Sequence, residues 1–323
     1  MDIKKKIPEL RQIIYQKLFP LIDNDYVLYD IPFHNNVGDL LIWEGELHFL
    51  KKIKYKRINS FSAFLFKKDQ HLLSNITILL HGGGNFGDIW RVHQEFRLKI
   101  IQEYPNNKII IFPQTVYYQN HETMLRDAEI MRKHKNLTIC ARDMVSYNFL
   151  KKYFNNNILL VPDMAFCIPP KQLLSQISHN QTNKTLYLKR GDKEFREGIN
   201  HDFENHRIDV YDWPCMTHYD FVQILFKILL RLKLYNLSLW YAQHIYKGHL
   251  IKNSVKFVSQ YKEIYTTRLH TSILCTLLGK KHHILDNSYG KNKNFYDTWF
   301  QGLEGVEFIG TKSNETNSLN IKS

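Results

Sequence analysis

An apolar run that meets three consecutive glycines, within residues 76–90, constrains the fold of this chain more than any other stretch. The apolar and β-branched residues 76–80 predict a buried parallel strand. The glycines that follow predict a tight turn that a ligand can approach closely, because glycine has no Cβ. Asn85 and Asp88 are residue types that cap helices, and the N–H groups at a helix start favour an anion. The alternative is a glycine-rich turn that only shapes the connection.

Strand and helix patterns alternate through the first half of the chain. Strands are expected at 26–31, 76–80, 108–112, 137–141 and 158–161, with a further apolar segment at 58–66, and helices at 40–51, 88–103, 122–135 and 144–154. This alternation predicts a parallel doubly wound sheet. Ligands bind at the C-terminal strand edges of such sheets, so the polar residues after the strands are expected to share one rim. They are His34, Asn36, Asp39, His81, Asn85, Asp88, Gln114, Arg142 and Asp163.

A second alternating series follows a polar, irregular segment. Strands are expected at 185–189, 207–211, 237–241, 255–258, 263–267 and 282–285, and helices at 217–234, 244–252, 269–279 and 293–300. We therefore predict an N-terminal Rossmann-like domain at 1–170, a linker at 171–184, a C-terminal Rossmann-like domain at 185–310 and a disordered tail at 311–323.

The net charge of +13 favours anionic partners, namely phosphorylated substrates, a membrane surface or nucleic acid, although solubility alone could account for it. The four cysteines lie far apart without a Cys-x-x-Cys pair, which argues against a disulfide scaffold or a zinc site and fits a reducing compartment. Because no signal-peptide segment or membrane-spanning apolar run occurs, we expect a cytoplasmic protein.

Two segments have amphipathic helical patterns. Residues 4–19 place basic side chains around an apolar face. Docking of this face onto the protein core is the first interpretation, and peripheral attachment to the inner face of the membrane is the alternative. Residues 221–234 are interrupted by Lys227 and Arg231 at helical spacing, which predicts an amphipathic helix rather than a membrane span.

Arg268 and His270 flank a strand-to-helix turn in the second half, with Thr271 and Ser272 beside them. An arginine at such a point can clamp a phosphate or a carboxylate bidentately. The histidine is a natural general acid, and a capping or packing role is its alternative. Lys291, in the strand exit at 286–292, could reach the same anion unless this segment is an ordinary solvated loop.

Several motifs along the chain together carry a family resemblance. They are 81–88 (HGGGNFGD), 142–143 (RD), 162–165 (PDMA), 268–270 (RLH) and 286–292 (DNSYGKN), and the early segment 36–39 (NVGD) fits with them. In order and spacing, over residues 26–300, they resemble the polysaccharide pyruvyl transferase family, and most closely its bacterial exopolysaccharide branch.

The resemblance implies a fold similar to that of GT-B glycosyltransferases, with two Rossmann-like doubly wound domains facing a cleft. It implies transfer of a pyruvyl group from phosphoenolpyruvate to two hydroxyls of a sugar, as a ketal, in an exopolysaccharide or its lipid-linked precursor. By position, Arg142, Arg268, His270 and Lys291 serve the phosphoenolpyruvate site. Substrate binding is assigned to Asn36, Gly38, His81, Gly83, Gly84, Asn85, Asp88, Gln114, Asp163, Thr271, Ser272, Ser288 and Tyr289. Phosphoenolpyruvate is a substrate, and no cofactor or metal is expected.

The chemistry of phosphoenolpyruvate explains these residue types. Its phosphate and carboxylate require several cations in one pocket, which Arg142, Arg268 and Lys291 would supply. Protonation of its methylene carbon makes C2 electrophilic, and we expect His270 to donate this proton, since a nearby phosphate favours the charged imidazole. Asp39 or Asp88 could take the proton of the attacking hydroxyl, although either could instead cap a helix.

Two other functions fit parts of the sequence. A glycosyltransferase that uses a nucleotide sugar would also need a basic cleft and glycine-rich loops on the same architecture. A nucleic-acid-binding protein would explain the charge and the aromatic residues. However, the basic residues are scattered and no helix-turn-helix or RNA-binding motif is present, so we expect no nucleic-acid partner.

Overall fold

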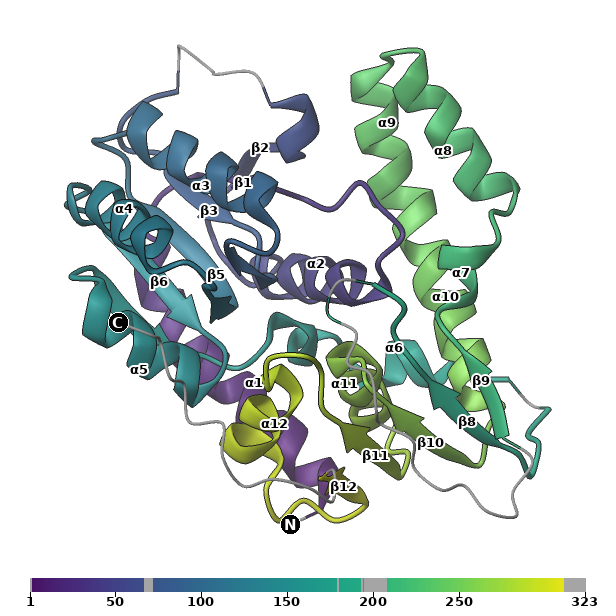
Figure 1. Cartoon of the computed structure of the whole chain (residues 1–323). Coiled ribbons are helices and arrows are strands. Elements are labelled where there is room, and N and C mark those ends of the chain that lie inside the picture. Colours follow the sequence, from purple (N-terminus) through teal and green to yellow (C-terminus); the bar gives the residue numbers. More distant parts are fainter. Residues whose placement is uncertain (1, 67–71, 179, 193, 195–207, 311–323) are drawn as a thin grey trace.

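Two parallel β-sheets form the framework of the computed structural model, which describes residues 2–66, 72–178, 180–192, 194 and 208–310 (Figure 1). Within these ranges the first sheet has seven strands, in the order β2-β1-β3-β5-β6-β7 with β4 paired to β5. They are β1 (Tyr26–Tyr29), β2 (Arg57–Phe61), β3 (Thr77–Leu80), β4 (Gly83–Gly87), β5 (Ile109–Tyr117), β6 (Leu137–Ala141) and β7 (Asn157–Leu160).

The second sheet has, in the same described ranges, five strands in the order β12-β11-β10-β8-β9. They are β8 (Thr185–Leu188), β9 (Ile208–Tyr211), β10 (Glu263–Thr266), β11 (His282–Leu285) and β12 (Val306–Ile309). The strand pairs of both sheets run parallel. The predicted α/β class with two Rossmann-like domains is therefore confirmed.

Helices connect the strands of both sheets. They are α1 (Ile3–Leu18), α2 (Val37–Leu50), α3 (Arg91–Glu103), α4 (His121–Arg132), α5 (Met144–Tyr153), α6 (Pro170–Leu174), α7 (Pro214–Thr217), α8 (Phe221–Arg231), α9 (Tyr235–Tyr241), α10 (Lys247–Ser259), α11 (Leu269–Leu277) and α12 (Lys291–Phe295). Short 3₁₀ or π turns are η1 (Phe19–Leu21), η2 (Ala63–Leu65), η3 (Met164–Cys167), η4 (Ala242–Tyr246) and η5 (Tyr296–Phe300).

Strand β3 is buried on both faces, as its apolar sequence predicts. Ile78 and Leu80 enter a core beneath α3, α4 and α5, whereas Leu79 enters a second core on the opposite face. The second core continues through α2 into the other sheet, where it includes Ile264 and Ile284. Helix α2 therefore packs between the two sheets, and it fixes how their strand ends face each other (Figure 1).

The glycine-rich segment after β3 differs from the prediction. It forms an extended strand of five residues, β4, rather than a tight turn into a helix. Gly87 has φ 129°, and a Cβ there would lie 1.7 Å from the carbonyl oxygen of Tyr117, so β5 leaves no room for a side chain. Helix α3 begins only at Arg91 without a side-chain cap. The prediction that Asn85 or Asp88 caps this helix is therefore wrong.

Two predicted strands of the second half are helical. Residues 237–241 belong to α9 and residues 255–258 to α10. Their side chains alternate in hydrophobicity over a few residues, but the buried positions Ile251, Ser254, Val255 and Val258 recur at helical spacing. Helix α6 extends into the segment predicted as an irregular linker, and β12 was not predicted. The predicted tail at 311–323 lies outside the described residues.

Helix α1 docks on the protein core. Its apolar face, which includes Leu10, Ile14 and Leu18, is buried. Arg11 donates hydrogen bonds to the carbonyl oxygens of Phe166 and Ile168, at 3.0 and 2.9 Å. The alternative of membrane attachment through this face is therefore wrong, because the face is already covered by protein. None of the described helices combines the length and apolar character needed to cross a bilayer.

Candidate active site

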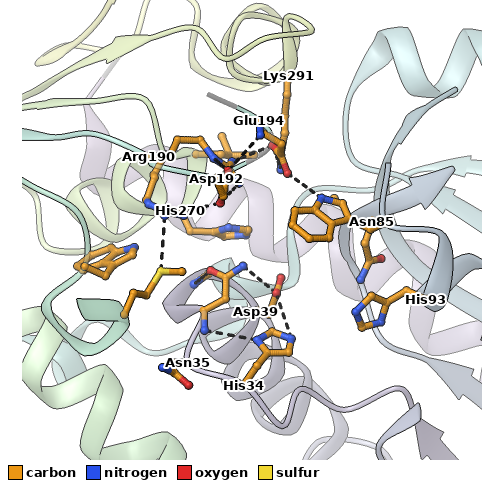
Figure 2. A pocket seen from close by; sticks show the side chains of 18 of the residues that line it. His34, Asn35, Asp39, Asn85, His93, Arg190, Asp192, Glu194, His270 and Lys291 are labelled. Atoms are coloured by element: carbon orange, nitrogen blue, oxygen red, sulfur yellow. Dashed lines mark hydrogen bonds and ion pairs between the residues drawn. The ribbon is translucent and has the colours of Figure 1, made fainter. Parts of the chain in front are cut away.

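A cavity of about 380 Å³ lies where strand ends of the two sheets face each other. Of the predicted site residues, Asn36, Gly38, Asp39, Gly84, Asn85, Arg268, His270 and Lys291 line it. Figure 2 shows side chains from both halves of the chain pointing into this space. Of the nine residues expected on a shared rim, His34, Asn36, Asp39 and Asn85 line the cavity, whereas Arg142 and Asp163 are buried and are not among the lining residues.

Two cations meet above the backbone of Gly84. A Cβ on Gly84 would lie 2.4 Å from Nζ of Lys291 and 2.8 Å from Nη2 of Arg142. Arg142 follows β6 and is fully buried, and its Nη2 has no hydrogen-bond partner in the described part of the chain. Its Nε donates to Oγ1 of Thr115 at 2.9 Å, which fixes the guanidinium plane. A glycine here lets two positive groups approach one point at the cavity wall.

Asp163 connects Arg142 to His270. Its Oδ2 accepts a hydrogen bond from Nη1 of Arg142 at 2.7 Å and lies 3.3 Å from Nε2 of His270. Its Oδ1 accepts from the backbone N–H of Ala165 at 2.9 Å. Burial raises the pKa of Asp163, but His270 and Arg142 outweigh it and hold the pKa well below its usual value. Asp163, which was assigned to substrate binding, is therefore an ionised carboxylate that orients two other site residues.

His270 packs against the first turn of α2. A Cβ on Gly38 would lie 2.3 Å from Nδ1 of His270, so only glycine leaves room for the imidazole. Burial lowers the pKa of His270, and Asp163 opposes this effect without cancelling it. In the protonated imidazole, Nε2–H is donated to Asp163, which supplies the partner that the sequence did not reveal.

Asp39 lines the cavity from the same turn of α2. Asn36 caps the helix by accepting from the N–H of Gly38 at 3.1 Å, and its Nδ2 donates to Oδ2 of Asp39 at 2.9 Å. Asp39 is therefore not the helix cap. Burial raises its pKa, but His34, His81 and His270 outweigh this effect and lower it. An ionised carboxylate faces the cavity beside the imidazole of His270.

Arg268 lines the cavity as predicted, but its charge is already paired. Its Nε and Nη2 donate to the two carboxylate oxygens of Asp212, each at 2.5 Å. Arg190, which the sequence analysis missed, is held in the same way by Asp192 at 2.8 and 2.9 Å. Arg190 follows β8, so its place at a strand end was the signal that could have identified it.

Glu194 joins groups from several elements at the cavity. Its Oε2 accepts from Nη1 of Arg190 at 2.8 Å, from the hydroxyl of Tyr289 at 3.0 Å and from Nζ of Lys291 at 3.3 Å. Its Oε1 accepts from Nε1 of Trp90 at 3.1 Å. Burial raises the pKa of Glu194, but Lys291 and Arg190 outweigh it and lower the pKa to about 2. Sequence reasoning did not find this residue.

Lys291 has a lowered pKa of about 8. Burial is the main cause, Arg142 and Arg190 add to it, and Glu194 opposes it. A bound anion would favour the charged ammonium, so this lysine is suited to a site that receives a negatively charged ligand.

Several predicted residues of the first half lie behind the cavity wall. His81 pairs through Nδ1 with Oε2 of Glu46 at 2.8 Å, and Gln114 donates to the carbonyl oxygen of His81 at 2.8 Å. Both are buried and support β3 and β5. Asp88 accepts from the backbone N–H groups of Gln119 and Asn120, so it caps the connection into α4. Gly83 is not in the cavity lining either.

Four predicted residues of the second half also do not line the cavity. They are Thr271, Ser272, Ser288 and Tyr289. Ser272 is 2.7 Å from Nε2 of His282, inside the second domain, and Thr271 is buried beside it. The backbone N–H of Ser288 donates to the carbonyl oxygen of Glu194. The ring of Tyr289 stacks on Tyr117 at 4.5 Å between centroids. Ser288 and Tyr289 therefore act on Glu194 rather than on a ligand.

The remaining cavity wall is aromatic and polar. Residues that sequence reasoning did not assign are Asn35, Trp90, His93, Asp192, Trp213, Met216 and Tyr219. Most of them follow strand ends, but no motif marked them. Within the described ranges, no group of three or more His, Cys, Asp or Glu side chains is arranged to hold a metal ion.

Comparison with known proteins identifies the family. The model of the family "Polysaccharide pyruvyl transferase" matches residues 36–289. The chain is 35% identical to "Putative pyruvyl transferase EpsO" of Bacillus subtilis, over 98% of each protein. It is 29% identical to "Pyruvyl transferase 1" of Schizosaccharomyces pombe, over 87% of this chain and 72% of that protein.

A solved structure supports the fold. The crystal structure of an uncharacterised protein from Klebsiella pneumoniae superimposes with a TM-score of 0.58 at 21% identity, covering 94% of this chain and 98% of that one. The motifs, the two parallel sheets and these matches lead to one conclusion. The chain belongs to the polysaccharide pyruvyl transferase family.

Proposed function

We propose that the protein transfers the enolpyruvyl-derived group of phosphoenolpyruvate onto two hydroxyls of one sugar, forms a pyruvate ketal and releases phosphate. The observation that carries this proposal is the convergence of Arg142 and Lys291 above Gly84, next to His270. A buried guanidinium nitrogen without a partner is costly to maintain, and an anionic ligand would satisfy it.

The charge distribution suggests how the donor is held. Among the described residues Nη2 of Arg142 has no hydrogen-bond partner, and Nζ of Lys291 lies beside it with Glu194 at 3.3 Å, so we assign one anionic group of phosphoenolpyruvate to these two cations. Arg190 and Arg268 are paired with Asp192 and Asp212, so they add less positive charge to the cavity than their number suggests. We assign them to the shape of the donor pocket and to hydrogen bonds with the second anionic group.

His270 is assigned as the general acid. It donates a proton to C3 of phosphoenolpyruvate, the methylene becomes a methyl group, and C2 becomes electrophilic. One sugar hydroxyl adds to C2, phosphate leaves and the second hydroxyl closes the ring. The sugar hydroxyls lose two protons. One of them restores the proton that His270 gave to C3, and the other leaves with phosphate, so atoms and charges balance. A bound phosphate favours the charged imidazole, which offsets the lowering of the His270 pKa by burial.

Asp39 is the candidate for the base that receives the hydroxyl proton. It is ionised and lines the cavity beside His270 and Gly38. Asp88, the other candidate from the sequence, is engaged with backbone groups of the α4 connection and does not line the cavity. The family description points to a polysaccharide, so the acceptor is proposed as a sugar of a bacterial exopolysaccharide or its lipid-linked precursor.

A nucleotide-sugar glycosyltransferase is the second candidate. The observation in its favour is the aromatic part of the cavity, where Trp90, Trp213 and Tyr219 could stack on a base as well as on a sugar. The test incubates the protein with phosphoenolpyruvate and candidate free, polymeric and lipid-linked sugars. Phosphate release matched by a sugar product that has gained the pyruvate ketal supports the proposal. Consumption of a nucleotide sugar with phosphoenolpyruvate untouched supports the alternative.

A further inference from the structure

Helices α8 and α9 form a hairpin that extends beyond the second sheet, and we call this hairpin, residues 221–241, the helical arm (Figure 1). The inner face of the arm is packed. Phe226 contacts Tyr246 at 4.3 Å and Phe33 at 5.3 Å between ring centroids. Gln223 and Asp220 form a capping box at the start of α8. The arm is therefore a built element whose orientation is fixed by the core.

The outer face of the arm is apolar and exposed. On α8 and its C-cap, Phe221, Ile224, Ile228 and Leu232 lie on one face at helical spacing, with Phe221 76% and Leu232 61% exposed. At the tip and along α9 the exposed set continues with Leu234, Tyr235, Leu237 and Trp240. Helices α8 and α9 pack against each other, and together they expose more large apolar side chains than is usual for neighbouring surface helices.

The charge on the arm has one sign. Residues 221–262 contain no Asp or Glu, and they include seven lysine and arginine residues. Lys227, Arg231 and Lys233 are exposed on the arm itself. Asp220, which precedes the arm, pairs with His249 at 2.6 Å. An apolar surface edged only by cations, with Trp and Tyr beside it, has the composition of a segment that lies in the interface of an anionic bilayer.

We propose that the outer face of the helical arm docks on the surface of an anionic phospholipid bilayer. Phe221, Leu232, Leu237 and Trp240 enter the headgroup region, and Lys227, Arg231 and Lys233 contact lipid phosphates. The chain just before the arm lines the cavity. Its lining residues are Trp213, which precedes α7, Met216, which lies within α7, and Tyr219. Docking would therefore bring the cavity close to the membrane, where a sugar carried on a lipid would be presented.

The docking does not depend on the proposed reaction. Docking is tested by sedimentation of the full chain with phosphatidylcholine vesicles, with and without phosphatidylglycerol. We expect binding to the anionic vesicles and little to the neutral ones, and weakening as salt rises. Arg231→Glu/Lys233→Glu should weaken binding by about 25-fold or more, because each cation near such a surface contributes about fivefold. Leu232→Gln/Leu237→Gln should weaken it by a similar factor.

Matched controls separate the arm from general surface effects. Lys4→Glu/Lys5→Glu makes the same charge change on exposed residues of α1, and Leu125→Gln/Leu174→Gln makes the same polarity change at residues 46% and 44% exposed. Both control variants keep the apolar side chains and the cations of the helical arm, so they should bind the anionic vesicles more tightly than the arm variants do. Phosphoenolpyruvate binding by calorimetry should be unchanged in the arm variants, so failure of docking and failure of the proposed reaction are distinguishable.

Three results would overturn the proposal. The first is equal binding to neutral and anionic vesicles, or none to either. The second is a loss in the Lys4/Lys5 variant as large as in the Arg231/Lys233 variant. The third is a solution mass of two chains that falls to one in Leu232→Gln/Leu237→Gln, because the arm would then be an interface with a second copy.

Discussion

The carboxylate of Asp163 and the imidazole of His270 follow strands of different sheets, and their Oδ2 and Nε2 atoms lie 3.3 Å apart. Asp163 also holds Arg142 at 2.7 Å, so a single carboxylate sets the position of the proposed acid and of one donor-binding cation. Both depend on how the two sheets face each other, which α2 fixes.

Asp163→Asn tests the orienting role. Asp163 raises the pKa of His270, and His270 must be protonated to act as the acid, so loss of Asp163 should lower that pKa further and move the alkaline limb of kcat/KM to lower pH. We also expect kcat to fall roughly 10- to 100-fold, because the imidazole is less well placed. Phosphoenolpyruvate itself titrates in the same range, so the comparison of the variant with the wild-type profile is the measurement. Superimposable profiles would remove Asp163 from this role.

His270→Asn tests the acid. General acid catalysis contributes about 10²- to 10⁴-fold, so kcat should fall by such a factor while the calorimetric Kd for phosphoenolpyruvate changes only a few-fold. In heavy water, the wild-type product should carry deuterium in its new methyl group. A variant that keeps near-normal turnover would exclude His270 as the proton donor.

Gly84→Ala tests the convergence of Arg142 and Lys291. The added Cβ would lie 2.4 Å from Nζ of Lys291, so the flexible lysine must move away from the donor site. We expect KM for phosphoenolpyruvate to rise about 10-fold or more, since a charge-assisted contact is lost. Gly248→Ala in α10 is the control, because nothing lies within 4 Å of its added Cβ. Equal KM values in both variants would contradict the assignment.

Gly38→Ala should affect the other half of the chemistry. Its Cβ would lie 2.3 Å from Nδ1 of His270, while alanine suits the helical backbone of α2. The imidazole would be displaced, so kcat should fall roughly 10- to 100-fold. The Kd for phosphoenolpyruvate should stay nearly constant. A rise in Kd with unchanged kcat would be the opposite of the expected pattern.

The pH dependence of donor binding tests Lys291. Its pKa of about 8 means that the ammonium is charged below that pH and lost above it. The Kd for phosphoenolpyruvate, measured by calorimetry, should therefore rise as pH increases through this value. Glu194 opposes the lowering of this pKa, so Glu194→Gln should move the change in Kd to lower pH. The change in Kd should be roughly tenfold, as expected for loss of such a charge. A Kd that is flat between pH 7 and 9 would exclude Lys291 from the donor contact.

The sequence predicted the parallel sheets because buried β-branched runs such as 76–80 and 137–141 have few alternatives. It also brought Asp39, Gly84, His270 and Lys291 to one rim, since residues after parallel strands share an edge. It failed at α9 and α10, where short alternating stretches imitate strands. It failed at Asn85 and Asp88, because tertiary pairing of β4 with β5 overrides the local preference for a helix start.

The contacts between site residues could not be predicted. Nothing in the sequence relates Glu194 to Trp90, or Asp163 to His270, because these pairs form only when the two sheets face each other. Arg268 was expected to be free for a ligand for a different reason, namely that its partner comes from another strand of its own sheet. Its partner Asp212 follows β9, a strand distant from β10 along the chain.

Calorimetric titration of phosphoenolpyruvate into the wild type, Lys291→Met and Arg142→Met measures whether these two cations bind the donor, with circular dichroism to confirm that each variant folds. We expect the wild type to bind phosphoenolpyruvate and each variant to bind it about 10- to 100-fold more weakly, because a charged hydrogen bond is lost. A wild type that binds a nucleotide sugar but not phosphoenolpyruvate, or folded variants that bind it as tightly as the wild type, would contradict the account.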